Sequence, residues 1–203
     1  GNTTHGVRLD LDLNTTAIPT AGGFNISYDF DPKIGSHTGV DGLTLAVGGD
    51  TATLGGTTNF IEGKVPFAVR TRDELMVVNF DSGATSEVIF YNTIDASIPL
   101  TGIRSLRVRV DSSDFTDGET ATAQIWINGF AVALTTNSFT WDNPGGENYI
   151  GLEARNLPLN VSDGTIIDNL SITTIPEPAS AAVLGVASLA LTGRRRGRCR
   201  ADH

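Results

Sequence analysis

The side chains best suited to ligand binding are two tryptophans that lie beside turn-rich stretches. Trp126 lies in "ATAQIWINGFAVAL" and Trp141 lies in "TWDNPGGENY". An indole ring can stack on the apolar face of a sugar, but it also supplies a large apolar area to a core. Both residues are therefore candidates for sugar binding, although burial in the core is the favoured interpretation for each.

The stretch "DSSDFTDGE" gathers carboxylates of the kind that calcium binds, among them Asp111, Asp114 and Asp117. Its spacing does not match that of an EF-hand loop. An acidic, solvated loop between two strands explains the same residues. We therefore predict no cofactor and keep calcium as the alternative.

The sequence offers few residues that could act as a nucleophile or as its general base. The only cysteine is Cys199, and the chain up to residue 174 holds only two histidines, His5 and His37. The sequence contains no Gly-x-Ser-x-Gly segment, which argues against a serine hydrolase. We predict a protein that is not an enzyme.

The charge of the chain is unevenly distributed. Five of the 14 basic residues lie in the last ten positions, so residues 1–193 hold nine basic and 22 acidic residues and carry a formal charge of −13. Such a surface repels nucleic acid. We expect no nucleic-acid partner.

Apolar and polar residues alternate with period two along much of residues 1–174, a length that suits one domain. The pattern is clearest in "FNISYDF" and recurs in "LTLAV", "LRVRV" and "IIDNLSI". Clusters of Gly, Asn, Asp and Pro between these runs favour turns. The pattern predicts many short antiparallel strands in a two-sheet β-sandwich.

Arg107 and Arg109 fall on the polar face of one predicted strand. They can meet an anionic polysaccharide, but pairing with nearby carboxylates across the strands is the favoured interpretation.

The strongest local signal is the Asn-Gly pair at 128–129, which tolerates the positive φ angles of a two-residue type I′ hairpin turn. The turn sets a register in which Trp126 faces Ala131, and continuing that register pairs Ala123 with Leu134. Trp126 therefore points away from the apolar row that forms the core.

Four segments, "FNISYDFDPKIGSHTGVDGLTLAV", "VVNFDS", "NYIGLEARN" and "TIIDNLSI", follow one another in this order. Together they resemble the concanavalin A-like family of lectins and laminin-G-type jelly rolls over most of residues 20–174. The resemblance implies an antiparallel jelly roll with carbohydrate bound on its concave face or loop rim. It places Asp41 where such lectins have a sugar-contacting aspartate. Asn79 stands where they carry a metal-binding Glu, and Asp81 is retained.

Laminarinase-type hydrolases share that fold and carry a Glu-x-Asp-x-x-Glu strand, with two carboxylates about 5 Å apart. The sequence contains no such segment. A glycan-active hydrolase is therefore a further alternative rather than the prediction.

The last 29 residues, 175–203, have a different character. The fifteen residues 179–193 carry no charge. As a helix they span about 22 Å, and arginine stems that reach the interface make up part of the difference from a bilayer core of about 30 Å. We expect a single transmembrane helix here, with the body outside the cytoplasm. The basic residues that follow it are Arg194, Arg195, Arg196, Arg198 and Arg200.

Pro176, Glu177 and Pro178 immediately precede this apolar segment. The order of motif, short helix and terminal basic cluster resembles the PEP-CTERM sorting signal of bacterial surface proteins. The resemblance implies recognition by an exosortase in the inner membrane and cleavage near the motif. A plain C-terminal anchor is the alternative.

The sequence thus predicts a concanavalin A-like β-sandwich over residues 1–174 and a sorting segment over 175–203. We expect an exported protein, anchored transiently and then located at the cell surface or in the extracellular matrix, with an extracellular polysaccharide as its ligand. A structural or adhesion module without sugar binding is the main alternative.

Processing can be tested directly. Because the tail resembles an exosortase substrate, protein extracted from the surface of a strain with an active exosortase should lack the residues beyond about Pro178. Intact-mass analysis measures this. Recovery of the chain with Cys199 and the arginines still attached would leave only the plain-anchor interpretation.

Overall fold

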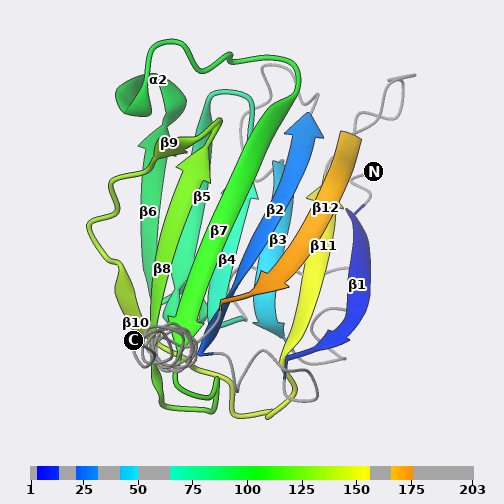
Figure 1. The fold of residues 1–203 in the computed structure, drawn as a ribbon, viewed down its shortest axis with the longest axis vertical. Helices are drawn as coiled ribbons and strands as arrows, with labels where there is room; N and C mark the ends of the chain where they lie inside the picture. Colours follow the sequence, from blue (N-terminus) through cyan, green and yellow to red (C-terminus); the bar gives the residue numbers. More distant parts are fainter. Residues whose placement is uncertain (1–3, 14–21, 32–41, 50–64, 156–165, 176–203) are drawn as a thin grey trace, which may run out of the picture.

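The computed structural model describes residues 4–13, 22–31, 42–49, 65–155 and 166–175, which form two antiparallel sheets packed face to face (Figure 1). Two short helical turns, η3 (Asp81–Gly83) and α2 (Tyr91–Ile94), follow β5 and β6. The predicted all-β, two-sheet sandwich is confirmed. The strands are β1 (Thr4–Asp12), β2 (Gly23–Asp31), β3 (Gly42–Gly49), β4 (Phe67–Thr71), β5 (Leu75–Phe80), β6 (Thr85–Phe90), β7 (Arg104–Ser112), β8 (Thr120–Ile127), β9 (Phe130–Ala131), β10 (Ser138–Thr140), β11 (Tyr149–Arg155) and β12 (Ile166–Thr174).

The predicted transmembrane helix over residues 179–193 lies outside the described residues. Within the described ranges, no helix has the length and apolar character needed to span a bilayer.

The two sheets are built from strands that are far apart in the sequence. Sheet I has the order β1-β11-β3-β4-β5-β6, and sheet II has the order β10-β8-β7-β2-β12 with β9 paired to β8. In sheet II, β2 pairs with β7 on one side and with β12 on the other. The outer face of sheet II therefore brings together side chains from four distant segments of the chain.

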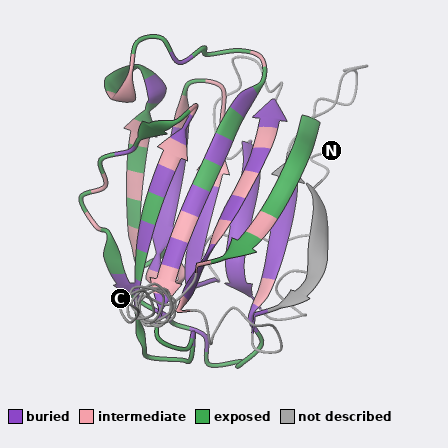
Figure 2. Ribbon diagram, in the orientation of Figure 1, coloured by how far each residue is buried: buried purple, intermediate pink, exposed green. Residues whose placement is uncertain are grey.

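The core lies between the sheets, and β2, β7 and β8 of sheet II enter it with every second residue (Figure 2). Burying a large apolar side chain contributes about 1.5–3 kcal/mol, so these rows are a substantial part of the packing energy, together with the buried residues of sheet I. The predicted alternation is confirmed for β2, β7 and β8. Their buried members are Phe24, Ile26, Tyr28, Phe30, Leu106, Val108, Val110, Ala121, Ala123, Ile125 and Ile127.

The predicted hairpin turn is confirmed, but the strand pairing predicted beyond it is wrong at Ala123. Residues Asn128 and Gly129 have φ angles of 49° and 85°, as a type I′ turn requires, and Trp126 pairs with Ala131. Ala123, however, bonds to Asn137 rather than facing Leu134. The expected pairing was wrong because the chain leaves the ladder after β9 and rejoins it as β10.

A carboxylate explains this detour. Glu87 of β6 accepts hydrogen bonds from the backbone N–H groups of Thr135 and Thr136, at 2.9 and 2.5 Å. These contacts hold the segment between β9 and β10 beside the edge of sheet I. A rule based on the residues of the turn cannot predict a contact with a strand that is distant in the sequence.

β12 also departs from its sequence pattern. Its register against β2 shifts between Asp168 and Ser171, and Asn169 adopts a left-handed backbone with φ 54°. The shift breaks the alternation, and most of this edge strand is exposed, including Ile167 and Leu170 at 38% each. The bulge turns Asn169 toward β2.

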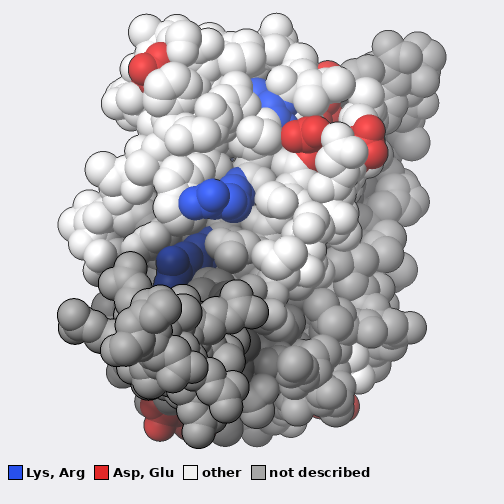
Figure 3. All heavy atoms as spheres, in the orientation of Figure 1, with Lys and Arg blue, Asp and Glu red and all other residues white. Residues whose placement is uncertain are grey.

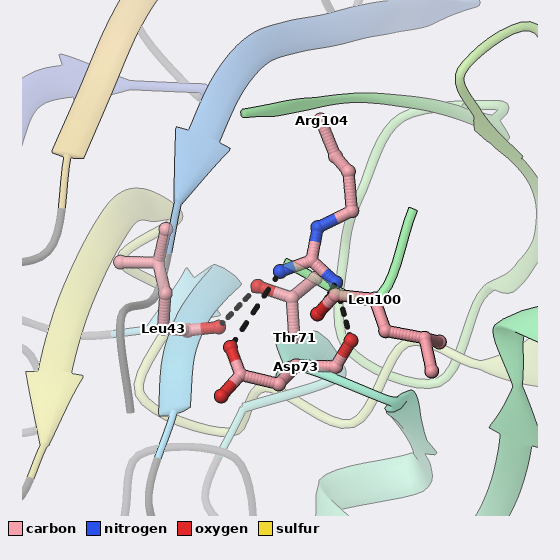
Figure 4. A network of polar contacts seen from close by, with 5 residues as sticks. All are labelled: Leu43, Thr71, Asp73, Leu100 and Arg104. Carbon is pink, nitrogen blue, oxygen red and sulfur yellow. Dashed lines mark hydrogen bonds and ion pairs between the residues drawn. The ribbon is translucent and has the colours of Figure 1, made fainter. Parts of the chain in front are cut away.

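Arg104, the first residue of β7, points into the core and its side chain is 0% exposed. Its Nη1 donates to the backbone oxygens of Asp73 at 2.5 Å and Leu100 at 3.4 Å, and its Nη2 lies 3.8 Å from Asp73 Oδ1 (Figure 4). Because Asp73 lies between β4 and β5, this side chain ties sheet II to sheet I.

Aromatic rings enclose the same guanidinium. Its central carbon lies 5.1 Å from the ring centroids of both Phe30 and Tyr91. Burial lowers the pKa of Arg104, and the nearby Tyr91 and Asp73 act in the opposite direction. Arginine remains protonated at any physiological pH, so the sandwich holds a buried cation that depends on these contacts.

Tyr28 and Tyr91 remain uncharged in the buried region around Arg104. Burial is the largest cause that raises the pKa of both hydroxyls well above that of free tyrosine. The Tyr28 hydroxyl has no hydrogen-bond partner in the described part of the chain. The rings beside Arg104 are therefore neutral, and the carboxylate of Asp73 supplies a countercharge for its guanidinium.

Removing the buried cation should be costly. Arg104→Ala deletes the hydrogen bonds to the backbone oxygens of Asp73 and Leu100 and the ion pair with the Asp73 carboxylate, so we expect a loss of about 3–5 kcal/mol in the free energy of unfolding. Urea denaturation of the full chain measures this. Arg107→Ala is the matched control, because that side chain is on the same strand but exposed. A loss below about 1 kcal/mol for Arg104→Ala would contradict the account.

Candidate functional site

The polar residues of sheet II form ordered rows on its outer face. Ser27 of β2, Arg107 of β7, Trp126 of β8 and Ala131 of β9 lie side by side in register. They occupy the positions between core residues, so the alternation that fills the core also turns them outward. Trp126 is half-buried and Arg107 is exposed.

This face is hollowed by a groove of about 520 Å³. In Figure 3, basic side chains gather over the middle of β7 and acidic side chains gather at the neighbouring ends of β2 and β12. The groove combines an indole ring, a cation, a carboxylate, an amide and two hydroxyls. It is lined by Ser27, Tyr28, Asp29, Ser105, Leu106, Arg107, Trp126, Gly129 and Asn169.

Trp126 and Arg107 form one unit. The guanidinium carbon of Arg107 lies 3.8 Å from the centroid of the indole ring, which is a close cation–π contact. Trp126 also borders a second hollow of about 180 Å³ on its β9 side, where Ala131 takes little space. The indole ring therefore separates a polar groove from a smaller, more apolar hollow.

The second outward arginine is neutralised. Arg109 Nε lies 2.8 Å from Asp111 Oδ2, and Nη2 donates to Oδ1 at 2.9 Å. This hydrogen bonding raises the pKa of Arg109. The expected pairing across the strands was wrong for both arginines: Arg109 pairs with a carboxylate of its own strand, and Arg107 stacks on Trp126.

Asp29 and Asn169 form the opposite wall of the groove. Asn169 Nδ2 donates to Asp29 Oδ2 at 2.6 Å, and the backbone N–H of Asn169 donates to Asp168 Oδ1 at 2.8 Å. The left-handed backbone at Asn169, which asparagine tolerates better than most residues, directs its amide to Asp29. The bulge in β12 therefore positions this pair.

Trp141 lies in the core and is 0% exposed. Its ring packs edge-on against Phe115 with centroids 5.0 Å apart, and its Nε1 donates to Asn148 Oδ1 at 2.9 Å. A sugar has no access to this ring. Of the two tryptophans, the structure leaves only Trp126 as a binding candidate.

The carboxylates of the stretch "DSSDFTDGE" accept hydrogen bonds from nearby protein groups. Asp114 Oδ1 accepts hydrogen bonds from the backbone and hydroxyl of Thr116, which lower its pKa, and Asp117 Oδ1 accepts one from the backbone of Asn143. Asp111 instead pairs with Arg109. Among the residues that the structure describes, no three His, Cys, Asp or Glu side chains gather to hold a metal ion.

Of the positions that the lectin resemblance singled out, Asn79 and Asp81 do not line the groove on sheet II. Asp81 Oδ1 accepts a hydrogen bond from the backbone of Thr140 at 2.6 Å, and Asn79 is buried on sheet I at 8% exposure. Asp41 falls outside the described residues. So do Pro176, Glu177, Pro178 and the arginines of the basic tail.

Sequence reasoning did not single out Asp29, Asn169 or Ser105. The alternation placed Asp29 outward, but the pairing of β2 with β7 and β12 joins segments too distant for a local pattern to align. The only local signal at Asn169 is the residue type, which favours a left-handed backbone.

No protein-family model and no curated protein sequence matches this chain. Solved structures do. The lectin UEA-II in complex with galactose is similar at 11% identity and a TM-score of 0.50, over 85% of this chain and 81% of that chain. The carbohydrate recognition domain of Emp46p is similar at 13% identity and a TM-score of 0.50, over 86% and 79%. At these identities the likeness is one of fold, and the chain has the β-sandwich architecture of lectins.

Proposed function

We propose that this chain is a non-enzymatic carbohydrate-binding protein whose ligand lies in the groove on the outer face of sheet II. One observation carries the proposal: Trp126 lines a groove of about 520 Å³ together with side chains that hydrogen-bond hydroxyl groups. The fold likeness supports it only in so far as this sandwich also serves as a lectin scaffold.

The chemistry of the groove suits a sugar. A sugar has an apolar ring face bordered by hydroxyls, and it needs an aromatic surface beside hydrogen-bond donors and acceptors. Arg107 covers one face of the Trp126 ring, so the aromatic surface that remains for a sugar is the edge of the ring and its face toward the smaller hollow. Asp29 supplies the acceptor, and Arg107 and Asn169 supply donors. All four are held by neighbouring side chains or backbone, so little order is lost on binding.

The two hollows beside Trp126 favour a polymer over a single sugar. The groove toward β2 and the smaller hollow toward β9 lie on either side of this ring. A chain that crosses Trp126 can place one sugar unit in each. The proposed ligand is therefore a polysaccharide.

A glycan hydrolase is the second candidate, because Asp29 and Asp168 are direct register partners on adjacent strands. Asn169 donates to both carboxylates, and Asp168 does not line the groove. In this arrangement both carboxylates accept hydrogen bonds from Asn169, and they do not face a common point in the groove where a glycosidic bond could lie. Release of reducing ends from a bound polysaccharide, lost in Asp168→Asn, would favour the enzyme.

The sequence of the tail supports a proposal for the place of action. We propose that the Pro-Glu-Pro motif, apolar segment and basic cluster of residues 176–203 direct export and exosortase sorting, so that the sandwich acts at the cell surface or in the extracellular matrix. Polysaccharides are abundant partners in that setting.

Replacing Trp126 should separate binding from folding. Trp126→Ala should reduce retention of the full chain on its immobilised polysaccharide at least tenfold, because one well-placed aromatic contact contributes about 2 kcal/mol. Thermal melting should change little. Phe90→Ala is the matched control, since Phe90 is an aromatic residue of β6 that is 46% exposed and lines neither of the two hollows beside Trp126.

Trp141→Ala should behave in the opposite way, with a loss of about 3–5 kcal/mol of stability from the emptied core site. Retention of Trp126→Ala at the wild-type level across a panel of neutral and acidic polysaccharides would overturn the groove as the binding site.

A further inference from the structure

We propose that the groove selects an acidic polysaccharide, and that Arg107 recognises a carboxylate on the sugar. This inference rests on the proposed carbohydrate-binding function and names its ligand class. It is carried by the arrangement of the two outward arginines and of the acceptor wall opposite them.

Arg107 is a cation prepared for an anionic ligand. Its guanidinium is stacked on Trp126 at 3.8 Å, and the side chain is exposed at the groove. In the part of the chain that the structure describes, it has no ion pair with a carboxylate. A planar guanidinium fixed against a ring can donate two parallel hydrogen bonds to a carboxylate.

Comparison with Arg109 shows that the lack of a carboxylate partner within the described structure is particular to Arg107. Both arginines lie on the outer face of β7, two residues apart, yet only Arg109 is bound by Asp111. A solvated polar face would give the two arginines similar partners. The positive charge available to a ligand is therefore concentrated where the groove and the indole ring meet.

The opposite wall fits the rest of a uronic acid. Asp29 lies diagonally across the β2–β7 pair from Arg107, because Ser27 is the direct partner of Arg107. Diagonal neighbours are about 7–8 Å apart, which one sugar ring can bridge. A uronate offers a carboxylate to Arg107 and hydroxyl donors to Asp29, so it matches both walls at once.

Apart from Asp29 in the groove wall and the acidic side chains at the ends of β2 and β12 (Figure 3), the acidic groups of the molecule oppose a polyanion at long range. At physiological ionic strength, charges more than about 8 Å apart are largely screened. The contact between Arg107 and a carboxylate is shorter than this distance. Local pairing therefore decides the selectivity despite the net charge of −9.

The first experiment compares two ligands of different charge, with the protein unchanged. Polygalacturonate and the same polymer with its carboxylates methyl-esterified share one backbone and differ in charge. The full chain should bind the free-acid polymer at least tenfold more tightly than the ester in an affinity electrophoresis or microcalorimetry titration. A neutral panel of cellulose oligomers, xylan and dextran completes the ligands.

Three variants test the assignment to Arg107. Arg107→Gln should abolish the preference for the free acid, and Arg107→Lys should restore part of it because the charge remains while the paired donors are lost. Arg109→Gln is the matched control and should keep the preference.

The outcomes separate this inference from the proposed function. Equal binding of the acid and the ester, with loss in Trp126→Ala, would keep the groove as a sugar site and overturn the acidic ligand. Binding to neutral glycans alone would do the same. A lack of binding to every polymer would overturn both proposals.

Discussion

The parity of positions along β7 determines both the interior and the surface of this protein. Even-numbered residues from Arg104 to Val110 point into the core, and odd-numbered residues such as Arg107 point outward. A shift of one residue would exchange the two sets, because successive side chains of a strand lie on opposite faces. Two arginines three positions apart therefore have opposite roles: Arg104 joins the sheets, and Arg107 faces a ligand.

Much of the fold was predictable from local patterns, since period-two alternation and turn chemistry act over a few residues. The core rows of β2, β7 and β8 and the turn at 128–129 follow directly from them. The interior cation was not predictable, because Arg104 depends on Asp73 and the rings of Phe30 and Tyr91, which the fold brings from other strands. The register beyond β9 failed for the same reason.

The candidate site was predictable only in part. The hairpin register placed Trp126 outward, but the sequence could not separate it from Trp141, whose burial results from Phe115 and Asn148. Asp29 and Asn169 join the groove through pairing between β2 and β12 and through a bulge. Such convergence of distant segments is the usual way in which a sheet face acquires a binding surface, and no linear motif records it.

The central claim is that the outer face of sheet II, rather than sheet I, binds the ligand. An amide and indole N–H NMR titration of the full chain with oligogalacturonate tests it most directly. The account predicts that the indole signal of Trp126 moves together with amides of β2, β7, β8 and β12, while the indole signal of buried Trp141 stays in place. Shifts confined to sheet I around Asn79, with the Trp126 signal unchanged, would contradict the account.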